Sequence, residues 1–326
     1  MGTEFINRWR FILPMLLVAA AVVAGCGRES HVQDQSVYAP VIRAIQPDGP
    51  VKIVTTTGMI TDIVKRVTRE RAEVTGLMGS GVDPHLYKAR QSDISALNQA
   101  DIVFYNGLHL EGKMGELLDR LGRRKPVVQV SRGIPRERLL RFSEVVDAYD
   151  PHVWFDVELW MSAVEVVRDS LAQLTPDYKV EYEANAAELL EELAELHEYC
   201  RERIGSIPEK QRVLITAHDA FGYFGKAYKI EVKGIQGIST ESEASIRDIN
   251  ELIGYIVERG VKAVFVETSV SQKNIEALIE GARARGHSLK IGGELFSDAM
   301  GAAGTPEGTY PGMVRHNVDT IADNLK

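Results

Sequence analysis

The spacing of apolar positions changes repeatedly along the chain, between the period of a strand and that of a helix. Short runs rich in β-branched residues, such as Val51-Lys52-Ile53-Val54-Thr55, predict strands, and helical patterns separate several of them. The predicted strands cover residues 51–55, 73–77, 101–105, 126–130, 212–216, 231–235, 263–267 and 289–293. The predicted helices include residues 92–99, 246–259 and 272–285. This alternation is typical of an α/β fold with mainly parallel sheets wrapped by helices.

One long helical pattern interrupts the alternation between the fourth and fifth predicted strands. Thr175 as N-cap and Pro176 at the first helical position predict its start, and the pattern runs to about Ile204. A chain of 326 residues also suits two domains better than one. We therefore predict an N-terminal lobe at residues 51–174, a linking helix at 175–206 and a C-terminal lobe at 207–326.

The N-terminus does not follow the α/β pattern. Arg8 and Arg10 precede an apolar run over residues 11–25, which is short for a membrane span and ends in small residues. We interpret residues 1–25 as a signal peptide and residues 26–50 as a polar tether. The sequence Val23-Ala24-Gly25-Cys26 resembles the lipobox of bacterial lipoproteins, which implies lipidation at Cys26. The alternative is an uncleaved anchor with an incidental cysteine.

Cysteine usage and charge narrow the class of protein. If Cys26 carries lipid, only Cys200 remains, so the mature chain has no intramolecular disulfide. The formal net charge is −8, and no basic stripe is present, so we expect no nucleic-acid partner. An acidic balance is compatible with a cation-binding protein. We expect a monomer.

Several histidines lie in loops that follow predicted strands or at the start of the next helix. His85 and His152 each close an Asp-Pro-His tripeptide, His218 follows the strand at 212–216, and Asp298 follows the strand at 289–293. Ligands of open α/β sheets bind outside the carboxyl ends of the strands, and proline fixes the backbone before each imidazole. A single Asp-Pro-His is more often ordinary turn chemistry. Two copies, with a third histidine and an aspartate in equivalent places, favour a metal site in a cleft.

The motifs also resemble a known family. Asp83-Pro84-His85, Asp150-Pro151-His152-Val153-Trp154, the stretches at residues 217–224 and 237–244, and Gly293-Glu294-Leu295-Phe296-Ser297-Asp298-Ala299 are similar, in this order, to the metal-specific solute-binding proteins of ABC transporters. The resemblance implies two α/β lobes bridged by a rigid helix, with one metal between them. It implies His85, His152, His218 and Asp298 as ligands, and an ABC permease with its ATPase as partners. It also implies a lipid-anchored location outside the cytoplasmic membrane, with Cys26 joining the chain to the membrane.

The ligand set leaves two metals open as the transported cargo, Mn²⁺ and Zn²⁺. Three imidazoles and one carboxylate suit Zn²⁺, whereas selection of Mn²⁺ would need geometry such as a bidentate Asp298. The chain lacks the long His- and acid-rich loop that zinc-dedicated members often carry. His109, Asp219 and Glu267 are candidates for orienting the imidazoles. The competing interpretation of these three is ordinary loop polarity.

Two other functions are alternatives to metal transport. A secreted zinc-dependent hydrolase would need an open coordination position for water, and four protein ligands leave little room for one. A surface adhesin is compatible with a lipid anchor, but no sequence feature requires it. Residues 107–113 have the Gly-x-x-x-x-Gly-Lys spacing, but Met114 stands where a P-loop needs Ser or Thr, so no complete P-loop is present and we expect ATP hydrolysis to belong to a partner. We expect a binding protein and not an enzyme.

Overall fold

The computed structural model describes residues 40–143 and 148–326. The predicted signal peptide, Cys26 and the first part of the predicted tether lie outside these residues. Residues 40–50 carry no helix or strand, but Ile42 and Ile45 pack against the core, and the backbone N–H of Ile45 donates to the carbonyl of Leu174 at 2.8 Å. In the ranges described, no helix has the length and hydropathy needed to cross a membrane.

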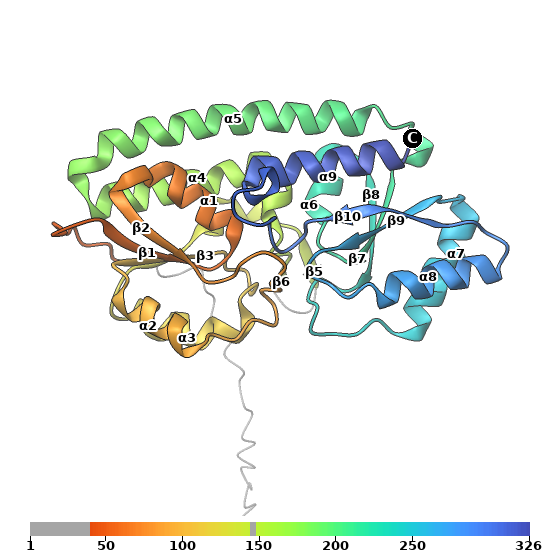
Figure 1. The fold of residues 1–326 in the computed structure, drawn as a ribbon, viewed down its shortest axis with the longest axis horizontal. Helices are drawn as coiled ribbons and strands as arrows, with labels where there is room; N and C mark the ends of the chain where they lie inside the picture. Colours follow the sequence, from red (N-terminus) through yellow and green to blue (C-terminus); the bar gives the residue numbers. More distant parts are fainter. Residues whose placement is uncertain (1–39, 144–147) are drawn as a thin grey trace, which may run out of the picture. The chain divides into compact units, whose positions relative to one another are not determined.

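Four parallel strands form the sheet of the N-terminal lobe. They are β1 (Val51–Thr55), β2 (Ala72–Gly76), β3 (Ile102–Tyr105) and β4 (Val127–Gln129), in the order β2-β1-β3-β4. Because successive side chains of a strand point to opposite faces, Ile53 joins one hydrophobic cluster and Val54 another. Helix α1 (Gly58–Thr68) lies on one side of the sheet, and α2 (Gln91–Gln99) and α3 (Gly115–Gly122) lie on the other (Figure 1).

The C-terminal lobe contains two parallel strand pairs. Strand β7 (Val213–His218) pairs with β8 (Glu231–Gln236), and β9 (Ala263–Glu267) pairs with β10 (Lys290–Leu295); β7 and β9 are in contact. Helices α6 (Gly222–Tyr228), α7 (Ile246–Arg259) and α8 (Lys273–Ala284) connect them. Ser245 and Asp248 form a capping box at the start of α7, and Gly260 ends it in the left-handed conformation. The α/β fold with parallel sheets is therefore confirmed.

The three longest helices of the described residues are α4 (Val157–Leu174), α5 (Lys179–Gly205) and α9 (Tyr310–Asn324). Helix α5 packs against α1, α4, α6 and α9, so it contacts elements of both lobes (Figure 1). Its 27 residues correspond to a length of about 40 Å. One hydrophobic cluster runs from β1 through these helices to the C-terminus, so the two lobes share a core.

The start of the long helix differs from the prediction. Residues Pro176–Tyr178 form a 3₁₀ turn, and the α-helix proper begins at Lys179. The hydroxyl of Thr175 does not cap the helix, because it donates to the carbonyl of Leu171 at the end of α4. Thr175 does stand at the N-cap position of the 3₁₀ turn, with Pro176 after it as predicted, but its hydroxyl makes no capping hydrogen bond.

Candidate metal centre

Four loops or strand ends bring His85, His152, His218 and Asp298 together. His85 lies between β2 and α2, His152 between the short strand β6 (Ala148–Tyr149) and α4, and Asp298 between β10 and α9. His218 is the last residue of β7, where it pairs in register with Gln236, so the strand runs two residues beyond the predicted end. All four side chains are buried, and the most exposed, His85, keeps only 3% of its surface.

The ligand atoms form a compact cluster in which all four lie within 4.8 Å of one another. Nε2 of His152 lies 3.3 Å from Nε2 of His85 and 3.3 Å from Oδ1 of Asp298. Nε2 of His218 lies 3.3 Å from Oδ2 of Asp298. Tetrahedral zinc with bonds of about 2.0–2.1 Å has ligand atoms about 3.3 Å apart, so these separations match a metal-sized cage.

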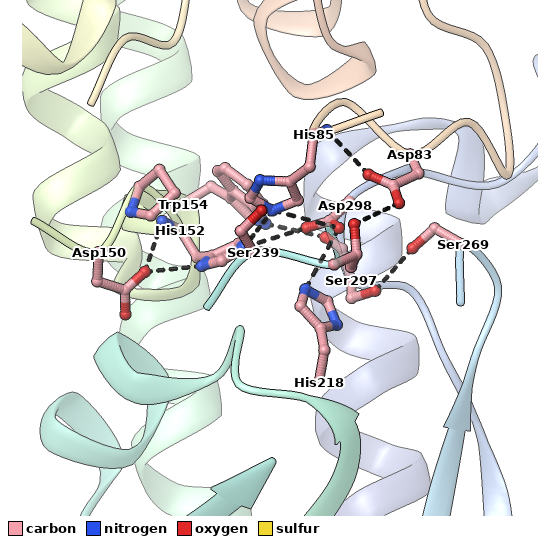
Figure 2. Close-up of polar contacts among 12 residues, drawn as sticks. Asp83, His85, Asp150, His152, Trp154, His218, Ser239, Ser269, Ser297 and Asp298 are labelled. Atoms are coloured by element: carbon pink, nitrogen blue, oxygen red, sulfur yellow. Dashed lines mark hydrogen bonds and ion pairs between the residues drawn. The ribbon is translucent and has the colours of Figure 1, made fainter. Parts of the chain in front are cut away.

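The Asp298 carboxylate has both oxygens buried and directed at the imidazoles (Figure 2). Neither oxygen accepts a hydrogen bond of good geometry, and Nε2 of His218 also lacks one. A buried carboxylate normally satisfies its oxygens with donors, because leaving them unpaired costs free energy. Unpaired ligand atoms converging on one point are the arrangement that a cation requires.

His152 is oriented by the aspartate of its own tripeptide. Oδ1 of Asp150 accepts from the backbone N–H of His152 at 2.9 Å and from its ring Nδ1 at 2.7 Å (Figure 2). A carboxylate only accepts, so Nδ1 carries the hydrogen and Nε2 faces Asp298. The carbonyl of Pro151 accepts from the side-chain amide of Asn106 at 3.0 Å, which ties this loop to the end of β3.

Glu267, at the end of β9, holds His218 in the same way. Its Oε1 accepts from the backbone N–H of His218 at 2.9 Å, and its Oε2 accepts from Nδ1 at 2.5 Å. Both side chains are fully buried. The sequence suggested Glu267 only by its place at a strand end; the structure shows that β7 and β9 put the two residues side by side.

His85 has a different environment. Oδ1 of Asp83 accepts from the backbone N–H of His85 at 2.8 Å, whereas Oδ2 of Asp83 accepts from the hydroxyl of Thr240 in the C-terminal lobe at 2.6 Å. Asp83 therefore holds the backbone at His85 and reaches the other lobe. Burial lowers the pKa of His85 to about 4, more than the nearby Asp298 raises it, so its ring is neutral at neutral pH.

The remaining ligands carry charge in the metal-free protein. Burial disfavours a charged His152 ring, but the Asp150 and Asp298 carboxylates outweigh it and raise its pKa to about 9. Burial also lowers the pKa of His218, but the Glu267 and Asp298 carboxylates outweigh this effect and raise the pKa well above its ordinary value. Burial alone would raise the pKa of Asp298, but the His218 and His152 rings hold it well below the ordinary value. A bound cation would replace the protons of these rings.

Polar and aromatic contacts fix the walls of the cluster. The Trp154 indole N–H donates to the carbonyl of Ser297 at 3.1 Å, and the Tyr310 hydroxyl donates to the carbonyl of Trp154 at 2.7 Å. Phe155 stacks on Phe221 with ring centroids 4.2 Å apart. These contacts join residues beside His152 to the C-terminal segments that carry Asp298 and His218.

The other two suggested orienting residues occupy different positions. His109 is exposed, has a positive φ of 65° and is not part of the four-residue cluster. Asp219 is half-buried next to His218, and burial, followed by Asp150, raises its pKa. Asp150, which orients His152, was not among the suggested residues. The sequence could have indicated Asp150, because the repeated tripeptide places an aspartate two residues before each histidine.

With this geometry established, known proteins provide a comparison. The family of the periplasmic component A of zinc-uptake complexes matches residues 53–324. The chain belongs to this family. Its members are binding proteins and not enzymes.

Relatives within this family differ in the metal that their names carry. A manganese-binding lipoprotein, MntA, of Bacillus subtilis is 44% identical over 315 residues, which are 97% of this chain and 99% of that protein. A zinc-binding protein, TroA, of Treponema pallidum is 51% identical over 278 residues, which are 85% of this chain and 90% of that protein. The solved structure of the periplasmic TroA superposes with a TM-score of 0.83 at 50% identity, covering 85% of this chain and 99% of that one.

Proposed function

We propose that this protein binds one Mn²⁺ or Zn²⁺ ion outside the cytoplasmic membrane and delivers it to an ABC permease. The buried cluster of three imidazoles and one carboxylate carries the proposal, because its ligand atoms come from four separate segments, and both Asp298 oxygens and Nε2 of His218 have no hydrogen-bond partner. The related proteins named above bind manganese or zinc by name, which supports the same cargo class here.

The cluster favours capture over hydrolysis. Four protein ligands complete a tetrahedral zinc sphere, whereas a hydrolytic zinc keeps a position for water. The ligands are also buried, so a substrate could not approach the ion without displacing side chains. A coordination sphere without water in the metal-loaded protein would support this assignment, and a bound water replaceable by small inhibitors would contradict it.

Both candidate metals fit the donor set in different ways. With one Asp298 oxygen bound, the site is four-coordinate and suits Zn²⁺. With both oxygens bound, the site has five ligand atoms, and neither oxygen has a hydrogen bond that would prevent this. Affinity for imidazole and carboxylate ligands rises from Mn²⁺ towards Zn²⁺, so we expect Zn²⁺ to bind more tightly in vitro. Metal availability then decides the cargo in the cell.

Replacing His218 with Ala tests the proposed site. This variant should lose tight binding of Mn²⁺ and Zn²⁺ in competitive titrations, whereas the exposed His109→Ala should retain one equivalent with unchanged affinity. Elemental analysis of protein purified from its native host identifies the cargo. Unchanged stoichiometry and affinity in His218→Ala would disprove the site.

The N-terminal sequence is the basis for a proposed location of the protein. We infer that residues 1–25 are removed and that lipidated Cys26 anchors a monomeric chain to the membrane, with the permease and its ATPase as partners and no role for nucleic acid. The names of several relatives describe lipoproteins, which supports this location. In cell fractionation, Cys26→Ala should move the protein out of the membrane fraction, and membrane retention without lipid would contradict the anchor.

A further inference from the structure

A second set of contacts joins the two lobes beside the ligand cluster. Besides the hydrogen bond from Thr240 to Asp83, Nζ of Lys113 lies 3.0 Å from Oε2 of Glu241. Thr240 and Glu241 belong to the loop between β8 and α7 in the C-terminal lobe, whereas Asp83 and Lys113 belong to the N-terminal lobe. We define these four residues as the interlobe latch.

The Asp83 end of the latch is directly coupled to a metal ligand. One Asp83 oxygen accepts from the backbone N–H of His85, and the other accepts from the Thr240 hydroxyl. The carboxylate is thus a two-ended connector between the loop of the C-terminal lobe and the backbone at His85. Hydrogen bonds to an ionised carboxylate are stronger than neutral ones, and the 2.6 Å separation from Thr240 is in the short range.

Among the four ligands, only His85 has an exposed residue directly beside it in the chain. His152 and His218 have their rings held by buried carboxylates, and Trp154 and Tyr310 join the lobes on the His152 side. Leu86, directly after His85, is 50% exposed. Metal release requires at least one ligand segment to leave, and the segment nearest to solvent is the one that the latch holds.

From this arrangement we propose that Thr240 is a positioning residue that sets the rate of metal release by fixing His85 through Asp83. The role presupposes the proposed metal site, because His85 must hold the ion for its loop to control release. The Lys113–Glu241 pair contributes less to the contact between the two lobes, because both side chains are more than a third exposed and salt weakens such pairs.

The test measures metal dissociation in a stopped-flow experiment with excess chelator. Thr240→Val keeps the shape of the side chain and removes the donor, so release should be roughly tenfold faster. Thr240→Ser retains the hydroxyl and should release metal at the wild-type rate. Ser242→Ala, an exposed change on the same loop, is the matched control and should also match wild type. Lys113→Met should accelerate release about twofold at low salt and not at high salt.

Two results would overturn the latch. One is an unchanged release rate in Thr240→Val, and the other is a Thr240→Ser variant that is as fast as Thr240→Val. Equilibrium titration is done on every variant, so that failure of the latch is distinguishable from failure of the metal site. If wild type binds one equivalent tightly and only the rate prediction fails, the latch is wrong and the metal site stands. If wild type binds no metal, both fail.

Discussion

The two Asp-Pro-His loops have the same local sequence and different surroundings. In both, the aspartate accepts from the histidine backbone N–H, at 2.8 Å for Asp83 and 2.9 Å for Asp150. Asp150 also holds the ring of His152, whereas Asp83 turns its second oxygen to Thr240 of the other lobe. The comparison teaches that one turn motif can either orient a ligand ring within its own lobe or link a ligand's backbone to the other lobe.

The largest expected effect is the loss of either ligand. His85→Ala and His152→Ala should each weaken metal binding by more than the roughly 10–100-fold that removal of an orienting residue produces. Only His152→Ala also strips a buried carboxylate, Asp150, of its ring partner, so it alone should clearly lower the melting temperature of the metal-free protein. Competitive titration and thermal unfolding measure the two effects. Equal melting temperatures for metal-free His85→Ala and His152→Ala would contradict the expected difference between the two loops.

The next effect comes from the two aspartates. Asp150→Asn should weaken metal binding by about 10–100-fold, because the His152 ring loses a charged partner. Asp83→Asn should weaken equilibrium binding less, by under about tenfold, because the ring of His85 is not held by Asp83. Its main effect should be faster release. A larger equilibrium loss in Asp83→Asn than in Asp150→Asn would reverse the comparison.

The residues that follow the two histidines should differ in stability. Val153 is fully buried, whereas Leu86 is 50% exposed. Val153→Ala should lower the free energy of unfolding by about 2 kcal/mol, because it leaves a cavity in the core. Leu86→Ala should change it by less than about 0.5 kcal/mol. Chemical denaturation of the metal-free variants gives both values, and a Leu86→Ala cost as large as that of Val153→Ala would show that the His85 loop is packed as tightly.

The last comparison concerns the protons on the two histidine rings. His152 has a pKa raised to about 9 and is protonated at pH 7, whereas His85, with a pKa lowered to about 4, is not. Metal binding must therefore displace a proton from His152 and none from His85, and affinity should fall about tenfold or more per pH unit as the pH decreases below 9. Calorimetry in buffers of different protonation enthalpy counts the protons. Asp150→Asn should reduce the count and Asp83→Asn should not; no change in Asp150→Asn would contradict the assignment.

The strands and several helices could be predicted from the sequence because their signals are local. The runs at β1, β9 and α7 carry their own periodicity and caps, and their observed bounds agree closely with the prediction. Helix α4 was missed because ten of its 18 residues are buried, so its apolar face is wide and its amphipathic pattern is less distinct. Helix α9 was missed because Pro311 and Gly312 look like helix breakers, although proline is tolerated in a first turn.

The sequence by itself determined the chemical kind of site. Histidines and an aspartate near predicted strand ends favour a shared site at the carboxyl edges of parallel sheets, although His152 follows the short strand β6 of an antiparallel pair. The repeated tripeptide marked two of the ligands. Only the tertiary structure decided how each ligand is held. Glu267, which holds His218, is 49 residues away from it in the chain, and Thr240 is 157 residues away from its partner Asp83. No local sequence pattern encodes such separations. Packing of the two lobes around a shared core brings these partners into contact, and that packing gives the two copies of one tripeptide different roles.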